Sequence, residues 1–465
     1  MNSQNQNEFK WDKPTEIEIP SSWSEIFQHT SVGPKVQNKN ITAGSCFLLF
    51  FDSIIDMLCD ELNIILSSLI KYNSWKQSNF FPIDRLTFMT WIIIWVQMGI
   101  IQTGNLRDYW SNNQEFHWIK RLMSRDRWIL IWRAIWHLPE EVLILLEIEL
   151  NQNYIKHWNP YEYISIDECM RLFKGWSRHK VYSPDKPVKR GLKFYLGVDS
   201  AQFCFYVEMY KSNRGEAKTK KKEMKTKDLV LRITNNLPKD MGPYRIYTDN
   251  YYGSLELAED LHNKGFYFTL GCRKTRPSFL FGMGLHKELS EFYDLEEFGC
   301  WVYPDGRYAA ISWKDKSMVN FISNQHFNEV DTVMQKQHKE KEKSLKQIPL
   351  VAKDYSTKGM GHVDSFDAHL VRSYPKHKNY VWRRCYFLTL LKISIVNSWI
   401  YYKYSHEKPY SQTDFLVKFQ EDIEREVEEG KRLKIIERRK RKYEKYNQKR
   451  KPKKKRKLDL YIFKK

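Results

Sequence analysis

The sequence predicts an α/β protein in which a mixed β-sheet carries a β-rich insertion and follows an all-helical region. Three observations indicate this fold class. Residues 47–150 form apolar runs of helical character, residues 163–270 change to short runs with period two, and residues 273–349 contain a strand–turn–strand pattern. A chain of 465 residues, 42% hydrophobic and 15% aromatic, has enough apolar material for two or three domains.

The N-terminal part divides into an arm and a helical region. Residues 1–39 are polar and contain Pro14, Pro20 and Pro34, which predicts a flexible arm. Residues 40–160 hold runs rich in Leu, Ile and Trp that are separated by polar breaks. These runs predict a helical domain.

The most apolar stretch of the chain, Leu86 to Ile101, is interrupted by Thr90 and Gln97. It is shorter than the roughly 18 to 20 apolar residues that a membrane span needs, so we predict a core helix. The first seven residues are polar and lack an apolar signal region. We therefore expect neither a membrane partner nor secretion.

The α/β region begins at Tyr163, where alternate residues fall on opposite faces of a strand. Further strands are expected at residues 192–198, 203–210, 245–249 and 266–270, and a helix at residues 255–262. The order strand, hairpin, strand, helix, strand predicts a mixed sheet. We assign this sheet domain to residues 161–272 together with residues 350–405.

Residues 273–349 read as a separate β-rich insertion domain, because Trp301 to Tyr308 gives a strand, a Pro-Asp-Gly turn and a second strand. After it, the apolar helix expected at residues 382–402 returns to the core. Residues 406–465 are then expected to form a charged helix followed by a basic tail.

The positive charge of the chain is concentrated at its C-terminal end. Residues 431–465 hold 19 Lys and Arg against 3 Asp and Glu, which accounts for +16 of the total formal charge of +21. Such a run displaces counterions from phosphate, so nucleic acid is the favoured partner class, although a solvated tail without a role is a common alternative. The tail contains the run Pro452, Lys453, Lys454, Lys455, Arg456 and Lys457. This pattern indicates binding to a nuclear import receptor and a nuclear protein.

The seven cysteines are scattered singly, and neither they nor the 13 histidines have zinc-finger spacing. We therefore expect no structural zinc.

Four aspartates are candidates for metal-dependent chemistry. Asp167 is expected to end the first strand and Asp249 the third, and the carboxyl ends of strands are where ligands collect. Asp364 and Asp367 lie three residues apart, so on a helix they share a face. Carboxylates from separate elements suit two hard cations that cleave a phosphodiester. Each residue alone also has a plainer interpretation as a strand-edge, turn or helix-terminal acid.

The sequence around these aspartates resembles that of piggyBac transposases. The first block runs from Tyr163 through Asp167 to Gly191-Leu192-Lys193, and the second is Tyr247-Thr248-Asp249-Asn250-Tyr251-Tyr252-Gly253-Ser254-Leu255. The third, Gly359-Met360-Gly361-His362-Val363-Asp364-Ser365-Phe366-Asp367, is similar to the family's third catalytic block, with His362 in place of the usual second Gly. The resemblance extends from about Ser31 to Tyr402, with the motifs in the family's order.

The resemblance implies a ribonuclease-H-like catalytic domain in which Asp167, Asp249 and Asp364 bind two Mg²⁺ or Mn²⁺ ions and Asp367 supports them. It also implies cut-and-paste excision of a transposon and integration at TTAA sites in double-stranded DNA. Family members act as synaptic pairs, which implies a homodimer, and the region at residues 40–160 is expected to serve DNA binding or dimerisation.

Seven residues are candidate DNA contacts. Four basic residues lie in or next to the first block, and three lie at the start of the predicted C-terminal core helix: Lys174, Lys186, Lys189 and Arg190, then Trp382, Arg383 and Arg384. The other tryptophans are mostly interleaved with apolar residues, so we expect core packing for them.

Three interpretations of function remain open. The intact aspartates favour an active transposase. Many piggyBac-type transposases end in a cysteine-rich zinc-binding domain, and its absence here, together with His362, favours a domesticated, catalytically inactive nuclear DNA-binding protein. A scaffold that binds nucleic acid only through its tail would leave the three blocks unexplained.

Overall fold

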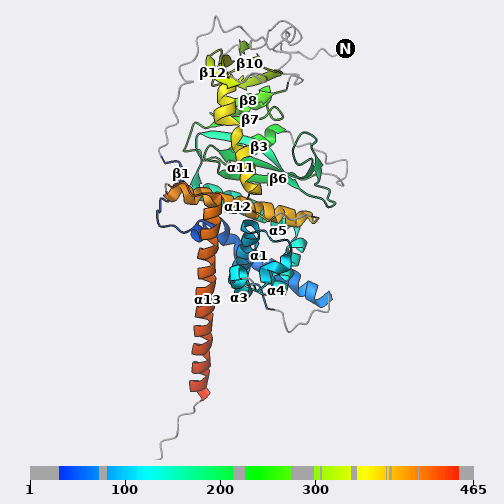
Figure 1. Ribbon diagram of the computed structural model, residues 1–465. Coiled ribbons are helices and arrows are strands. Elements are labelled where there is room, and N and C mark those ends of the chain that lie inside the picture. Colours follow the sequence, from blue (N-terminus) through cyan, green and yellow to red (C-terminus); the bar gives the residue numbers. More distant parts are fainter. Residues whose placement is uncertain are drawn as a thin grey trace, which may run out of the picture.

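The computed structural model describes residues 31–72, 81–112, 114–212, 226–273, 298–303, 306–336, 343–372, 374–375, 380–406 and 408–449. A helical body lies at one end of this structure and a sheet covered by helices at the other (Figure 1). The long helix α13 runs along the helical body and projects beyond it (Figure 1).

The helical body begins with five helices, as the apolar runs predict: α1 (Ala43–Tyr72), α2 (Arg85–Ile100), α3 (His117–Leu122), α4 (Arg125–Ala134) and α5 (Glu140–His157). Helix α2 is capped by Asp84, whose carboxylate accepts a hydrogen bond from the Thr87 backbone N–H. All residues from Phe88 to Gly99 are buried, because this helix is apolar on every side. The predicted core helix is therefore confirmed, and among the helices in the described ranges none has the length and apolar character of a membrane span.

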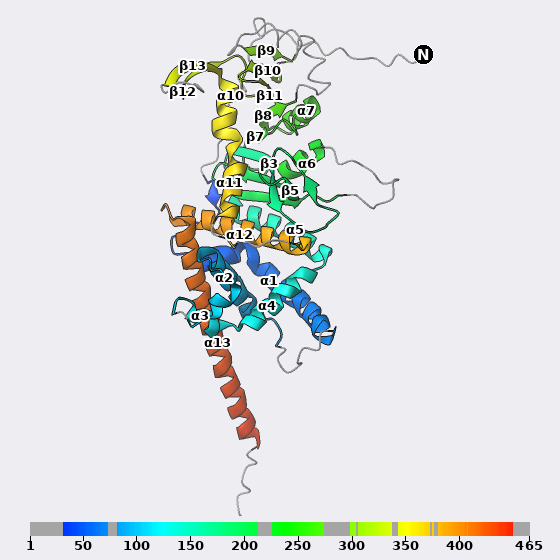
Figure 2. The ribbon, with the colours of Figure 1, turned by 45° about the vertical axis from the view of Figure 1, so that its right-hand side comes forward.

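Two C-terminal helices complete the helical body: α12 (Trp382–His406) and α13 (Gln412–Lys449). Helix α12 is buried along most of its length, between the helical body and the sheet (Figure 2). Helix α13 packs against α1, where Phe419 contacts Phe47 and Ile423 lies against Gly44, and against α2, where Gly430 lies against Leu86.

The centre of the sheet is formed by five strands: β3 (Tyr163–Leu172), β5 (Arg190–Asp199), β6 (Cys204–Met209), β7 (Arg245–Thr248) and β8 (Tyr267–Cys272). Their order across the sheet is β6-β5-β3-β7-β8. Strands β6, β5 and β3 pair antiparallel, whereas β3, β7 and β8 pair parallel. This mixture agrees with the α/β sheet predicted from the strand and helix order.

The segment expected to be a separate insertion instead extends the same sheet. Strands β9 (Phe298–Val302), β10 (Ala309–Lys314) and β11 (Met318–Ser323) follow β8 in the order β8-β11-β10-β9. The junction is the antiparallel pairing of β11 with β8, which covers an edge that would otherwise expose unpaired backbone groups. A two-stranded ribbon of β12 (Val330–Lys336) and β13 (Lys343–Pro349) forms its own sheet.

Helices cover both faces of the main sheet. Helices α6 (Thr226–Thr234) and α7 (Leu255–Asn263) lie on one side (Figure 2). On the other side lie α10 (Leu350–Asp354), the π-helical turn η8 (Tyr355–Gly359) and α11 (Gly361–Val371) (Figure 2). These last three elements follow one another directly and bring the third block onto the sheet.

Short elements complete the fold. Strand β1 (Gly33–Pro34) pairs with β2 (Trp158–Asn159), and β4 (Val181–Tyr182) pairs with the start of β5.

Candidate active site

Asp167 and Asp249 occupy equivalent positions on neighbouring parallel strands. The parallel register pairs Ile166 of β3 with Thr248 of β7, and each aspartate is the next residue. Because both strands run the same way, the two side chains leave the same face of the sheet. Asp249 follows the end of β7, as predicted, but Asp167 does not end its strand. Strand β3 continues to Leu172 through its pairing with β5, so only its parallel-paired part ends at Ile166.

The π-helical turn η8 carries Asp364 onto this face. The Met360 N–H donates to the Tyr355 carbonyl at 2.9 Å, a spacing of five residues that widens the turn. Gly359 sits directly against the buried Tyr247 ring, since an added Cβ would lie 2.2 Å from it. This close approach lets α11 begin beside the strand ends, with Asp364 in its first turn.

His362, which replaces a glycine of the family's third block, causes no crowding at Asp364. Its imidazole Nε2 lies 2.7 Å from the Lys358 carbonyl oxygen of the preceding turn.

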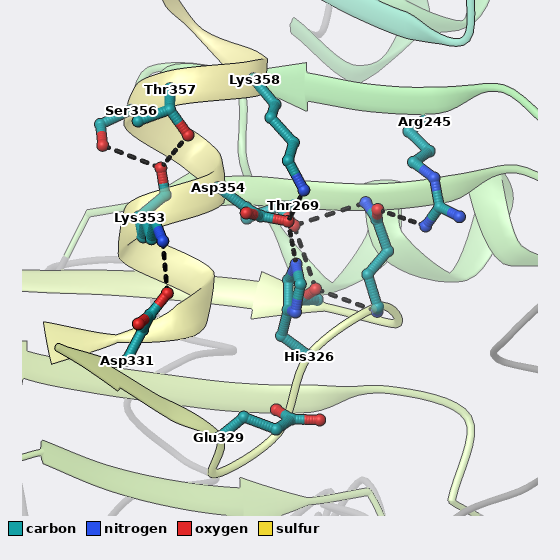
Figure 3. A network of polar contacts seen from close by, with 12 residues as sticks. Arg245, Thr269, His326, Glu329, Asp331, Lys353, Asp354, Ser356, Thr357 and Lys358 are labelled. Carbon is teal, nitrogen blue, oxygen red and sulfur yellow. Dashed lines mark hydrogen bonds and ion pairs between the residues drawn. The ribbon is translucent and has the colours of Figure 1, made fainter. Parts of the chain in front are cut away.

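A network of ion pairs fixes the approach of this helix (Figure 3). The carboxylate of Asp354, at the end of α10, lies 3.2 Å from His326 Nε2 and 3.1 Å from Lys358 Nζ. Burial alone would raise the pKa of Asp354, but the hydrogen bonds from His326 and Lys358 outweigh it and lower the pKa. The preceding residue, Lys353, forms an ion pair with Asp331 of β12. The loop after β11 and the separate β12–β13 ribbon thus hold α10 and η8, which lead into the helix that carries Asp364.

Asp167 and its neighbour Glu168 differ in electrostatic environment. Asp167 is only 7% exposed, and its burial is the main cause that raises its pKa, with the charge of Glu168 adding to it. Burial would also raise the pKa of Glu168, but Lys193 and a hydrogen bond donated by the Tyr252 hydroxyl at 2.8 Å lower it. Glu168 is therefore the carboxylate that the protein itself stabilises in the charged form.

Lys186 is the cation around which the acidic residues gather. Its Nζ lies 3.8 Å from Asp167 Oδ2 and 3.9 Å from Glu168 Oε1. Burial alone would lower the pKa of Lys186, but the attraction of four carboxylates raises it. They are Asp167, Glu168, Asp364 and Asp249. All three predicted catalytic aspartates thus act on one ammonium group.

The donor set fits divalent cations of the magnesium type. The predicted ligands are carboxylate oxygens, and within the described part of the chain buried Asp167 is paired with the Lys186 ammonium group, so additional positive charge would be favourable there. Among the residues that the structure describes, no three Asp, Glu, His or Cys side chains are close enough to bind one ion as they stand. The three aspartates therefore do not converge to ligand distance, although the charges of all three act on Lys186.

Asp367, predicted as a supporting acid, forms an ion pair with Arg171 of β3. Arg171 is only 9% exposed and lies four residues after Asp167, on the same face of the strand. The pair fastens α11 to β3 in the turn that follows Asp364, so Asp367 is placed to position the helix.

Most of the basic residues predicted as DNA contacts lie at the surface. Lys174, Lys189 and Arg190 are exposed, and Lys186 is partly exposed. The Arg190 guanidinium lies over the Tyr182 ring at 4.9 Å.

The prediction that Arg384 faces DNA is wrong. This residue is 5% exposed, and its guanidinium lies over the rings of Trp132 and Trp136 at 4.7 and 5.0 Å. Because Arg384 lies in a largely buried part of α12, its side chain points into the helical body. Trp382 is half-buried, with its ring packed edge-on against His179 at 5.0 Å and Arg383 over it at 4.9 Å.

Three residues that shape this region were missed by the sequence predictions: Arg171, Tyr355 and Trp176. The Tyr355 hydroxyl donates to the Thr248 carbonyl at 3.1 Å, directly before Asp249. Trp176 is 88% exposed, although tryptophans were assigned mainly to the core. Its position among Lys174, Arg178 and Lys180, outside any apolar run, was the available signal. The basic run at residues 452–457 lies outside the described residues.

Comparison with known proteins gives concordant matches. The family model described as "Transposase IS4" matches residues 42–399. Human PiggyBac transposable element-derived protein 2 is 23% identical over 404 residues, which are 81% of this chain and 64% of that protein. Human PiggyBac transposable element-derived protein 3 is 24% identical over 336 residues, 68% of this chain and 54% of that protein. The chain thus spans between about half and two thirds of the length of these relatives.

A solved structure supports the fold. A cryo-EM structure of a piggyBac transposase synaptic complex with hairpin DNA matches with a TM-score of 0.69 and 19% identity, over 87% of this chain and 84% of that chain. The predicted α/β fold class, a mixed sheet preceded by an all-helical region, is confirmed by this likeness.

Proposed function

Since this chain belongs to the piggyBac-type family of IS4 transposases, we propose that it is a DNA transposase that excises and integrates DNA by metal-dependent phosphodiester chemistry. The observation that supports the proposal is electrostatic and geometric: Lys186 lies 3.8 Å from Asp167, and the charges of Asp249 and Asp364 also act on it. Asp167 and Asp249 stand at equivalent positions of parallel strands, and Asp364 joins them from the helix that covers their face.

Asp167, Asp249 and Asp364 would hold two Mg²⁺ or Mn²⁺ ions, which when bound supply Lewis-acid activation of the attacking and leaving oxygens. The protein's own residues align this site. Arg171 holds Asp367 and thereby α11, while Tyr252 and Lys193 keep Glu168 charged beside Asp167. Lys186 balances the acids before substrate arrives, and its ammonium is then placed to contact a DNA phosphate.

The substrate we propose is double-stranded DNA, comprising transposon ends and TTAA target sites. The projecting part of α13 supports a polyanionic partner, because residues 431–449 contain ten Lys and Arg and two Glu, and the side chains described there are exposed (Figure 1). Such a helix neutralises phosphates without reading sequence. A homodimer, nuclear location and import through residues 452–457 complete the proposal.

The test is a cleavage assay with full-length protein, Mg²⁺ and labelled DNA from the flanks of the source locus. We expect Mg²⁺-dependent nicking that is lost in Asp249→Asn, because one metal ligand is weakened, while DNA binding persists. Asp126→Asn is the matched control, since Asp126 lies in α4 with its side chain 82% exposed. Nicking by Asp249→Asn at the wild-type rate would remove Asp249 from the site.

A second candidate is a domesticated DNA-binding protein without catalysis. Two observations favour it: the relatives are named as transposable element-derived proteins, and in the described part of the chain the aspartates do not converge to ligand distance. In the same assay, wild-type protein that binds DNA but does not nick it with Mg²⁺ or Mn²⁺ would establish this candidate.

A further inference from the structure

The segment after β3 presents a row of exposed basic and aromatic side chains. From Arg171 to His179 buried and exposed residues alternate, with Leu172, Lys174, Trp176 and Arg178 exposed. Trp176 is 88% exposed, which is the largest value among the large hydrophobic residues described. An indole left in water forgoes the free energy that its burial would give, so this exposure needs a reason.

The backbone that carries Trp176 is held in place from both sides. An added Cβ on Gly175 would lie 2.0 Å from the Tyr380 carbonyl oxygen, so the segment passes directly against the chain leading into α12. Lys180 Nζ donates to the Gly175 carbonyl at 2.9 Å. On the other side, His179 is 1% exposed and accepts at Nδ1 from the Ser212 N–H at 3.1 Å. Trp176 is therefore displayed on a fixed backbone.

Exposed basic residues lie close to Trp176 in the chain and at the same end of the sheet. Lys174 is exposed two residues before it, and the sheet register that pairs Gly191 with Leu172 brings Arg190 to the same end of the sheet. The Arg178 guanidinium is engaged 3.1 Å from Glu140, so it supports the segment. A rigid aromatic ring between surface cations is the arrangement that binds single-stranded nucleic acid.

We propose that Trp176 is a stacking site for an unpaired base of the DNA substrate, with Lys174 and Arg190 contacting the flanking phosphates. This inference rests on the proposed function, because it requires that the protein handles DNA. The base must be unpaired or terminal, because inside a duplex both faces of a base are covered by its neighbours. A protein partner would need a larger exposed apolar patch around Trp176. Within the described stretch 172–180, Leu172 is the only other large hydrophobic residue that is exposed, at 51%. A protein partner is therefore disfavoured.

The experiment measures DNA binding, so it does not depend on cleavage. Full-length protein carrying Asp249→Asn is titrated by fluorescence anisotropy against a flush duplex and against the same duplex with a four-nucleotide unpaired end. We expect Trp176→Ala to weaken binding of the unpaired end by between about 5-fold and about 150-fold, the range for one stacked base, and to change flush-duplex binding by less than about twofold. Trp176→Phe should retain part of the preference, because it keeps an aromatic face.

Two further variants serve as controls. Leu172→Ala removes the other exposed apolar side chain of the segment and should leave both affinities unchanged. Lys174→Gln should weaken the binding of both DNAs to the same extent, because it removes a phosphate contact.

Equal affinities of the Trp176→Ala variant and its parent for the unpaired end would overturn the proposal, as would an equal loss on both DNAs. If the parent binds neither DNA, this inference fails together with the proposed function. If binding of both DNAs is normal and only the Trp176 effect is missing, the inference fails alone.

Discussion

Gly359 is the position where one added methyl group should separate the Asp364 helix from the sheet. The Cβ of an alanine there would lie 2.2 Å from Tyr247 Cδ1, 2.5 Å from Cγ and 2.8 Å from Cε1. The Tyr247 ring cannot give way easily, because it is fully buried between the rings of Tyr163 and Tyr355. The π-helical turn must therefore move away from β7.

The size of this movement sets the expected effect. Ordinary contact begins at 3.4 Å, so the turn must retreat by about 1 Å. A shift of about 1 Å in a catalytic group costs roughly 100-fold in rate, and overpacking of a core costs about 1–3 kcal/mol of stability. We expect Gly359→Ala to lose about two orders of magnitude in Mg²⁺-dependent cleavage while remaining folded.

Gly361→Ala is the matched control for this substitution. It lies two residues away in the same block, and nothing lies within 4 Å of its added Cβ. As the first residue of α11 it should tolerate alanine with full activity. Both variants are measured by DNA cleavage, by urea denaturation and by the rise in Tm that Mn²⁺ causes, which reports the metal site without cleavage. The reasoning is refuted if Gly359→Ala keeps wild-type cleavage and Mn²⁺ response, or if Gly361→Ala loses as much.

Two further predictions concern buried polar groups. Asn397 is fully buried and bonds both the N–H and the carbonyl of Cys204, at 3.0 and 2.7 Å. Asn397→Ala should lower the free energy of unfolding in urea by about 3 kcal/mol. Asn151 makes the same pair of bonds to the Val207 backbone but is itself half-buried, so Asn151→Ala should cost less; equal losses would contradict the argument. Burial raises the pKa of Glu147 to about 7. Between pH 4.5 and 7 the folded state therefore keeps a proton on Glu147 that the unfolded state releases. The free energy of unfolding should fall by about 3 kcal/mol as the pH rises from 4.5 to 7. Glu147→Gln should remove this slope in urea titrations across that range, and an unchanged slope would assign it to other groups.

The sheet positions of two aspartates were accessible from the sequence because local signals determine them. Period-two alternation located β3 and β7, and the residues after their parallel-paired stretch are Asp167 and Asp249. The placement of Asp364 could not be predicted from local signals. It depends on the direction of α11, which is set by a π-helical turn and by the contact of Gly359 with Tyr247. The sequence named Asp364 as a candidate from its spacing to Asp367, but only the resemblance to a family grouped it with Asp167 and Asp249.

Non-local pairing explains what the sequence predictions missed. The strands at residues 298–323 have the same local pattern whether they form a separate sheet or extend an existing one, and the pairing of β11 with β8 decides between these outcomes. Similarly, a run of Trp and two Arg at the start of a helix says nothing about its rotation. The rings of Trp132 and Trp136, about 250 residues earlier, contact the Arg384 guanidinium and so place this side chain in the interior.

The two neighbouring acids of β3 differ in how the protein stabilises their charge, and this difference supports the proposed role of Asp167 as a metal ligand. The Glu168 carboxylate accepts a hydrogen bond from the Tyr252 hydroxyl and is attracted by the charge of Lys193. The protein therefore stabilises the negative charge of Glu168 without any ligand. Asp167, more deeply buried, accepts the Glu168 N–H and faces the mobile-ended side chain of Lys186. A lysine ammonium can leave along its flexible stem when a stronger cation arrives, whereas a fixed hydrogen bond cannot. The fold thus leaves buried Asp167 beside a cation that can be displaced, which supports the metal-binding role that we propose for this residue.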